Sequence, residues 1–292
     1  MFSKVRDMFE QAIRAFALGF LYFCGGKLGL GLALIHPSAS AIWPPSGIAL
    51  AGLLLLGMRA WPGIAFGAFA VNVTNLGTPL TSAAIAMGNT LEAVLGAWLI
   101  SRYARGRYVF ERGQDVLRFA LAAMIATTVA ATAGAATLHL GGLSEGTAFA
   151  KIWRTWWLGD ASGALTLAPL LLTWAAHPHR KVTRKGTLEL TTALLVLCTG
   201  LAAVFWEWLP VGQKGYPLLM LMLPILLWIA FRFSQRETAL AVFVISLIAV
   251  AGTTRATGPF SADAQNESLL YLQTFLATIS IMSMTLTAAV QE

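Results

Sequence analysis

Two carboxylic acids inside long apolar segments are the side chains best suited to chemistry in this chain. Glu92 stands within NTLEAVLGAWL, and Asp160 stands within WWLGDASGALTL. A charge near the bilayer centre costs roughly 2.5–3.5 kcal/mol on insertion scales, so each acid predicts an internal partner or a water-filled site. Three roles stay open: a ligand or signal site, a proton or ion pathway, and a structural role satisfied by Asn, Ser, Arg154 or Lys27.

Polar and aromatic neighbours accompany both acids at helical spacing. Asn89 lies three residues before Glu92, so the two side chains share one helix face. Trp153, Trp157 and Asp160 form a similar stripe, at spacings of four and three. Tryptophans in such a segment are more typical of an aromatic belt at the membrane–water interface than of a ligand site.

Glycines four residues apart predict close helix contacts. Gly159 and Gly163 flank Asp160, and Gly63 and Gly67 form a second pair. Small residues at this spacing let another helix approach closely. Asp160 is therefore expected beside a tight helix crossing, and such crossings allow small helix displacements.

The elements that position these residues are membrane helices. Of the 292 residues, 57% are hydrophobic and 11% are charged, whereas a soluble domain averages about 25% charged residues. The composition predicts an all-α integral membrane protein, a polytopic bundle of about 8–10 transmembrane helices in one domain over residues 1–292. The predicted segments are 12–34, 41–57, 61–77, 80–101, 116–138, 153–176, 188–209, 217–233, 237–255 and 268–289.

The second and third segments form a hairpin, WPPSGIALAGLLLLGMRAWPG, at residues 43–63. Trp43 suits a membrane–water boundary, with its N–H near water, and Pro44 and Pro45 suit a helix start or break. Met58–Ala60 is expected to form a tight basic turn. About 17 residues cover only about 25 Å of a roughly 30 Å core, so this pair is either two spans or a re-entrant hairpin that leaves eight.

Basic residues occupy every second connection between the predicted segments. The positive-inside rule then places both termini in the cytoplasm and explains the net charge of +7 without nucleic-acid binding. The residues that establish this alternation are Lys4, Arg6, Arg14, Arg59, Arg102, Arg105, Arg107, Arg112, Arg180, Lys181, Arg184, Lys185, Arg232 and Arg236.

Enzyme and metal chemistry find little support in the sequence. Cys24 and Cys198 give neither a disulfide framework nor metal-ligand spacing, and His36 and His139 belong to no metal motif. No Gly-rich phosphate loop or nucleophile motif is present. We therefore predict no catalytic residues and no metal site, and the sequence leaves any cofactor unidentified.

Several landmarks resemble the membrane-associated sensor family of the first type (MASE) in order and spacing. The resemblance covers nearly the whole chain and rests on five motifs, of which one alone would be weak. They are WPPSGIALAGLLLLG at 43–57, WPGIAFGAFAVNV at 61–73, GNTLEAVLGAWL at 88–99, WWLGDASGALTLAPLLL at 156–172 and PILLWIAFRFSQRETAL at 224–240. LQTFLAT at 272–278 looks similar too.

The resemblance implies a sensory domain of bacterial inner membranes that precedes a cytoplasmic output. Such outputs are histidine kinases, diguanylate cyclases and cyclic-di-GMP phosphodiesterases, and none of their motifs occurs in this sequence. The expectation is the N-terminal part of a longer signalling protein. By position, the family's characteristic polar residues, whose roles are unassigned, correspond to Trp43, Pro45, Asn72, Asn89, Glu92, Trp157, Asp160 and Arg232.

The predicted function is sensory, with these eight residues as candidates for signal or ligand sensing. A small-molecule ligand or a membrane cue shifts the bundle between two packings, and the last helix passes the shift to an output domain in cis, across a homodimer. Two alternatives are a secondary transporter, which intramembrane carboxylates and Trp-Pro breaks also suit, and a docking module for a partner membrane protein. The lipid bilayer is the surrounding partner in all three.

Overall fold

The computed structural model describes residues 2–31, 33–36, 39–40, 42–75, 77–144, 148–176, 183–208, 219–262 and 265–292. Each of the ten predicted segments coincides with one α-helix of this part of the chain. The helices are α1 (Phe2–Leu30), α2 (Pro44–Leu56), α3 (Trp61–Val73), α4 (Pro79–Tyr103), α5 (Gly113–Leu140), α6 (Phe149–Ala176), α7 (Arg184–Phe205), α9 (Leu223–Arg232), α10 (Gln235–Thr254) and α11 (Gln265–Gln291).

Six of these helices are long and apolar enough to cross a membrane, namely α1, α4, α5, α7, α10 and α11. Helix α6 is 28 residues long and lies among them, with Asp160 in its middle. Helices α2 and α3 have 13 residues each and α9 has 10. At 1.5 Å per residue these three reach only about 15–20 Å, so none of them alone crosses a core of about 30 Å. The predicted polytopic helical bundle is confirmed, and the shortness of α2 and α3 agrees with the re-entrant alternative.

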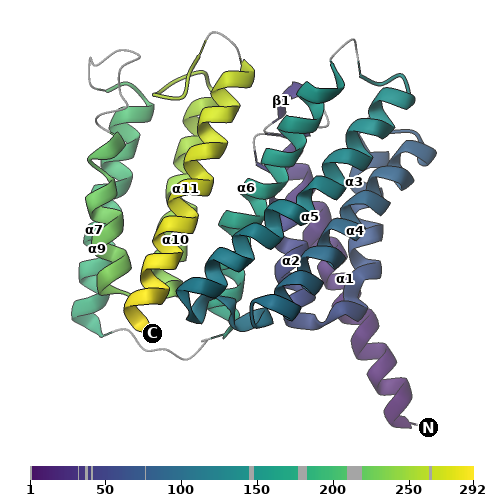
Figure 1. Ribbon diagram of the computed structural model, residues 1–292, viewed down its shortest axis with the longest axis horizontal. Coiled ribbons are helices and arrows are strands. Elements are labelled where there is room, and N and C mark those ends of the chain that lie inside the picture. The colour runs from purple at the N-terminus through teal and green to yellow at the C-terminus, as the bar shows by residue number, and fades with distance from the viewer. Residues whose placement is uncertain are drawn as a thin grey trace.

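The helices run up and down between two edges of the molecule, and both termini lie at the same edge, the lower one in Figure 1. Helices α1 to α5 stand on one side of α6, whereas α7, α9, α10 and α11 stand on the other. Helix α6 contacts α2 and α5 in the first group and α10 and α11 in the second. It therefore joins the two groups, together with the direct contact between α5 and α11.

The prediction was wrong about the end of the first segment. Helix α1 stops at Leu30 rather than near residue 34, and a short antiparallel pair of strands, β1 (Ala33–His36) and β2 (Ala39–Ser40), follows it. Two glycines close to each other in the sequence, at positions 29 and 31, weaken the helix there because glycine loses more backbone entropy than other residues.

The start and end of the Trp-Pro hairpin agree with the sequence. Pro44 and Pro45 occupy the first turn of α2, where an absent N–H costs no hydrogen bond. Met58–Ala60 forms a single turn of 3₁₀ helix, η1, after Gly57, whose φ of 92° suits a residue without a side chain. The next helix, α3, begins at once with Trp61 and Pro62.

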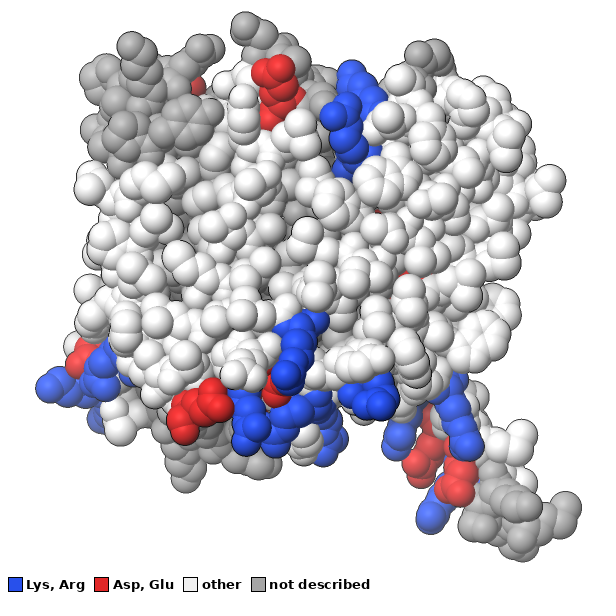
Figure 2. Space-filling view, in the orientation of Figure 1, with Lys and Arg blue, Asp and Glu red and all other residues white. Residues whose placement is uncertain are grey.

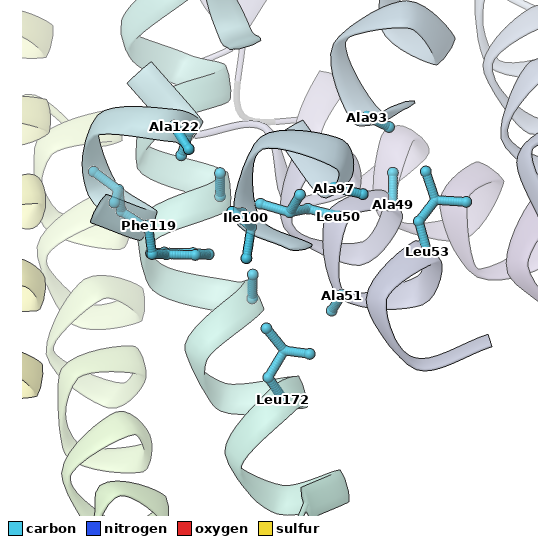
Figure 3. Packing of buried hydrophobic residues seen from close by; sticks show 14 of the residues in the cluster. Ala49, Leu50, Ala51, Leu53, Ala93, Ala97, Ile100, Phe119, Ala122 and Leu172 are labelled. Carbon is cyan, nitrogen blue, oxygen red and sulfur yellow. The ribbon is translucent and has the colours of Figure 1, made fainter. Parts of the chain in front are cut away.

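Three buried apolar clusters form the core of the described residues. The first lies mainly between α1, α2, α3, α4, α5 and α6 and includes residues of α10 and α11. The second lies mainly between α7, α9, α10 and α11, and the third lies between α4, α5 and α6. Figure 3 shows Leu50 of α2 next to Ala97 and Ile100 of α4, with Phe119 of α5 nearby. Small alanine side chains on these faces let the helices pack closely around the larger ones.

Helices α1 and α3 cross closely because glycines four residues apart on α3 leave room for the backbone of α1. A Cβ atom added at Gly63 would lie 1.9 Å from the Ala15 carbonyl oxygen, and one at Gly67 would lie 2.5 Å from the Gly19 carbonyl oxygen. Real Cβ contacts are essentially never shorter than 3.0 Å, so both positions require glycine. The predicted small-residue contact at Gly63 and Gly67 is confirmed.

The charged side chains gather at the edges of the bundle. Figure 2 shows most of them along the lower edge, where both termini lie, below a broad uncharged band. This distribution is the three-dimensional counterpart of the basic connections that alternate along the sequence. The uncharged band is the surface that an apolar bilayer core would cover.

Candidate functional site

Side chains from α2, α4 and α6 meet in one buried group, the acidic cluster, which consists of Ser46, Asn89, Glu92 and Asp160. The Ser46 hydroxyl donates a hydrogen bond of 3.2 Å to Oδ1 of Asp160. The Glu92 carboxyl lies beside both the Asp160 carboxyl and the Ser46 hydroxyl. Asp160 is 1% exposed and Glu92 is 5% exposed, so both acids are enclosed by protein.

Two aromatic side chains border the acidic cluster. Tyr22, fully buried on α1, has its hydroxyl next to the Trp43 indole and the Asn89 amide. The same hydroxyl is close enough to Glu92 and Asp160 to interact with both electrostatically. Four helices, α1, α2, α4 and α6, therefore contribute to one buried polar centre.

A backbone crossing between α2 and α6 holds Ser46 against Asp160. The Trp43 amide donates a 3.0 Å hydrogen bond to the Gly159 carbonyl oxygen. A Cβ at Gly163 would lie 1.9 Å from the Trp43 carbonyl oxygen, and one at Gly47 would lie 2.5 Å from the Gly163 carbonyl oxygen. The prediction that Asp160 lies beside a tight crossing built on small residues is confirmed.

Two buried carboxyl oxygens of this centre, Oε2 of Glu92 and Oδ2 of Asp160, have no hydrogen-bond partner among the described residues. Each can accept a hydrogen bond, or donate one when its carboxyl group is protonated. Leaving such groups unsatisfied costs roughly 1–3 kcal/mol each, so the arrangement favours anything that supplies matching hydrogen bonds.

The two cations considered as structural partners bind elsewhere. Lys27 donates to the Thr74 carbonyl oxygen at 3.0 Å, and Arg154 donates to the Ala150 carbonyl oxygen at 3.2 Å. No ion pair within the described ranges involves Glu92 or Asp160. The sequence analysis considered two kinds of structural partner for the acids, a polar side chain such as serine and a cation. The contact with serine is present, and the contact with Arg154 or Lys27 is not. Two adjacent acids without a cation can share a proton, or bind a cation or a hydroxyl group.

Three sensing candidates lie outside this centre. Asn72 donates to the Ala68 carbonyl oxygen at 2.8 Å and, through its own carbonyl, closes the turn after α3. Trp157 donates to the Met124 carbonyl oxygen at 2.9 Å, toward α5. Arg232, at the end of α9, pairs with Glu189 at 2.9 Å. The centre thus includes Asn89, Glu92 and Asp160, with Trp43 at its border and Pro45 buried in the first turn of α2.

Trp43 and Trp156 are buried inside the bundle rather than exposed on its outer surface. Trp43 is only 9% exposed and Trp156 only 7%. The Trp156 ring packs against Gly134 of α5. Trp153 and Trp157 stack with their ring centres 5.6 Å apart and are half-buried. Apolar segments in a multi-helix bundle bury tryptophan against neighbouring helices as readily as they expose it, and a periodicity argument cannot separate the two.

Sequence reasoning missed Tyr22 and Ser46. Each lies in an apolar run, in FLYFCGG and in WPPSGIAL respectively. A hydroxyl in such a run was the available signal, because a buried tyrosine or serine normally finds a polar partner. Nothing in the one-dimensional pattern indicates that these partners come from α4 and α6.

A sequence model of the MASE1 family matches residues 14–292, nearly the whole chain. The chain belongs to the MASE1 family. MASE1 domains are membrane sensory domains, so this chain is a multi-pass membrane sensory domain. No curated protein and no solved structure matches the chain.

Membership of MASE1 confirms the resemblance on which the sequence analysis relied. The five motifs quoted above correspond to α2, α3, the centre of α4, the part of α6 that contains Asp160, and the turn between α9 and α10. Three of them, on α2, α4 and α6, supply the acidic cluster. Among the described residues, no group of three or more His, Cys, Asp or Glu side chains comes together as a metal-binding set would.

Proposed function

We propose that the acidic cluster is the signal-sensing site of this MASE1 domain. The observation that carries the proposal is the burial of two adjacent acids, Glu92 of α4 and Asp160 of α6, each with one carboxyl oxygen that has no hydrogen-bond partner among the described residues. A purely structural core would gain stability from apolar residues at these positions, since buried polar groups without partners cost free energy. A site kept for binding tolerates that cost in its unbound state.

The tight α2–α6 crossing supports a two-state response. A ligand or cue changes the equilibrium between two packings only if it interacts differently with each of them. Ser46 and Asp160 belong to the two helices that meet at Gly163, so a group that replaces the Ser46–Asp160 hydrogen bond alters the contact between these helices. Sub-ångström changes at such a contact are amplified because packed helices have discrete arrangements.

Polar contacts along α11 support a route from the site to the lower edge. Ser280 of α11 donates to the Leu165 carbonyl oxygen of α6, five residues after Asp160. Further along α11, the hydroxyl groups of Thr287 and Thr238 are 3.0 Å apart, which joins α11 to α10. Gln291 donates to the Phe233 carbonyl oxygen at 2.7 Å. A displacement of α6 therefore has a direct hydrogen-bonded connection to the helix that ends at Gln291.

We further propose that both termini lie on the cytoplasmic side of a bacterial inner membrane, which the basic lower edge supports through the positive-inside rule. Helix α11 then delivers the signal to a cytoplasmic histidine kinase, diguanylate cyclase or cyclic-di-GMP phosphodiesterase, with a second copy of the chain as the partner in a homodimer. The stimulus is a small molecule or a membrane cue that reaches the cluster.

The test joins the chain after Glu292 to a diguanylate cyclase whose product is measured in cells. Asp160→Asn and Glu92→Gln keep the shape of each side chain and remove its charge, and both are expected to fix the output at one level across growth conditions. Glu111→Gln is the matched control, because Glu111 is 40% exposed and pairs with Arg105 away from the cluster. Unchanged, condition-dependent output from both cluster variants at normal expression would refute the assignment.

A secondary transporter is the second candidate that specific observations favour. The short helices α2 and α3 and the buried acids of α4 and α6 are features that transporters use at the bilayer midplane. Purified protein in proteoliposomes that accumulates a solute under an ion gradient, with loss of uptake in Asp160→Asn, would replace the sensory proposal. The sensory proposal expects no accumulation.

A further inference from the structure

The outer face of the α3–α4 pair carries an apolar groove with a volume of about 660 Å³. Its lining residues come from α3 and α4 alone, and none of them belongs to the acidic cluster. Its volume lies in the range of small-molecule sites, about 300–1,000 Å³. The lining residues are Trp61, Pro62, Ala65, Phe66, Phe69, Ala83, Ala86, Met87, Thr90, Leu91 and Val94.

The groove faces the surface that a bilayer would cover, and it offers almost no polar atom. Phe66, Met87 and Leu91 are 76%, 63% and 51% exposed, which in a membrane means contact with hydrocarbon. The one hydroxyl in the lining, that of Thr90, donates to the Ala86 carbonyl oxygen at 2.6 Å. An occupant of the groove itself is therefore a hydrocarbon chain rather than a polar molecule.

The lower end of the same helix pair has the residues of a membrane–water interface. Trp61 at the start of α3, and Trp98 and Tyr103 near the end of α4, are each about half exposed. The Trp98 and Tyr103 rings meet edge to face with their centres 6.3 Å apart. Aromatic side chains of this kind mark the depth of lipid headgroups, so the groove begins just inside that depth.

Two exposed cations stand at this headgroup level. Arg59 lies in η1, two residues before Trp61, and Arg102 lies in the last turn of α4, above the Tyr103 ring at 5.3 Å. Neither guanidinium forms an ion pair with any residue that the structure describes. By contrast, Arg105, Arg112 and Arg232 at the same edge all pair with carboxylates.

We infer that the α3–α4 groove binds one acyl chain of an anionic glycerophospholipid, with the phosphate held by Arg59 and Arg102. From Trp61 to Phe69 the wall of α3 rises about 12 Å, which accommodates much of one chain. Two arginines at the interface favour an anionic headgroup over a zwitterionic one by about fivefold each, or roughly 30-fold together. The inference concerns a second site and does not depend on the role of the acidic cluster.

The experiment titrates the purified full chain in detergent with phosphatidylglycerol and, separately, with phosphatidylcholine of the same acyl chains. Native mass spectrometry counts bound lipids at each concentration. We expect one tightly bound phosphatidylglycerol, weakened roughly 30-fold in the double variant Arg59→Gln/Arg102→Gln to the level of phosphatidylcholine. Arg107→Gln is the matched control, since Arg107 is exposed at the same edge but contacts Tyr108.

A second pair of variants tests the groove itself. Met87→Trp fills it and is expected to weaken binding of both lipids, whereas Leu121→Trp, at a similarly exposed position of α5 outside the groove, is expected to leave binding unchanged. Equal affinity of the wild-type chain for the two lipids would overturn the inference. So would unaltered phosphatidylglycerol binding by the double arginine variant or by Met87→Trp. A third outcome would also overturn the inference: the spectra show a dimer of the wild-type chain, Met87→Trp abolishes this dimer, and lipid binding is unaffected. In that case a second copy of the chain, rather than a lipid, covers the groove.

Discussion

Replacing Gly163 with alanine should disrupt the acidic cluster without touching any of its side chains. The new Cβ atom would lie 1.9 Å from the Trp43 carbonyl oxygen and 2.6 Å from the Trp43 carbonyl carbon. Both are backbone atoms at the start of α2, so no flexible side chain can move aside. To restore a contact of 3.0 Å, α2 and α6 must separate by about 1 Å.

The loss of folding free energy that this separation of α2 and α6 causes can be estimated. Ser46 is one turn from Trp43, and its hydrogen bond to Asp160 is already 3.2 Å long, so a further 1 Å takes it out of hydrogen-bond range. Overpacking costs about 1–3 kcal/mol and loss of the hydrogen bond about 0.5–1.5 kcal/mol. We expect the free energy of unfolding to fall by roughly 2–4 kcal/mol and, in the cyclase fusion, the output to become insensitive to conditions.

The assay is thermal unfolding of the purified protein in detergent, followed by tryptophan fluorescence. Gly113→Ala is the control, because a Cβ at Gly113 would lie 3.4 Å from its nearest neighbour, the Thr285 carbonyl oxygen, which is ordinary van der Waals contact. Gly163→Ala should melt several degrees below both the wild type and Gly113→Ala. Wild-type melting together with wild-type output in Gly163→Ala would refute the argument that this crossing holds the cluster together.

Three further variants separate the cluster from its surroundings. Ser46→Ala removes the donor to Asp160 and should lower stability by about 0.5–1.5 kcal/mol and alter the fusion's output, unlike Ser101→Ala at an exposed position of α4. Ser280→Ala removes the α11–α6 hydrogen bond and should reduce the response to conditions while the basal output persists; an intact response would exclude this route. Arg232→Gln removes an exposed ion pair with Glu189 and should change stability by less than about 1 kcal/mol and leave output unchanged. A large loss of output in Arg232→Gln would show that Arg232 takes part in sensing after all.

The sequence predicted the helices well because their signals are local. Long apolar runs, Pro44 and Pro45 at a helix start, and Met58–Ala60 as a turn depend on residues within a few positions of one another. The glycine pairs also predicted tight crossings, although not their partners. Gly63 meets α1 and Gly163 meets α2, and these pairings depend on the packing of the whole bundle.

The candidate site could be predicted only in part. Asn89, Glu92 and Asp160 stand out because polar groups are rare in apolar segments, and they meet in the structure. Asn72, Trp157 and Arg232 stand out equally in sequence but satisfy their hydrogen bonds elsewhere. Whether a side chain faces the interior, a neighbour or lipid is set by tertiary contacts, so the sequence alone does not predict that Trp43 is buried.

The most direct test of the central claim is a double-mutant cycle on the output of the cyclase fusion. Glu92→Gln, Asp160→Asn and the double variant are compared with the wild type at matched expression. If the two acids form one sensing site, the double variant should behave like either single variant, with a coupling of about 0.5–3 kcal/mol between the two substitutions. Independent, additive effects, or output that follows growth conditions as in the wild type, would contradict the account.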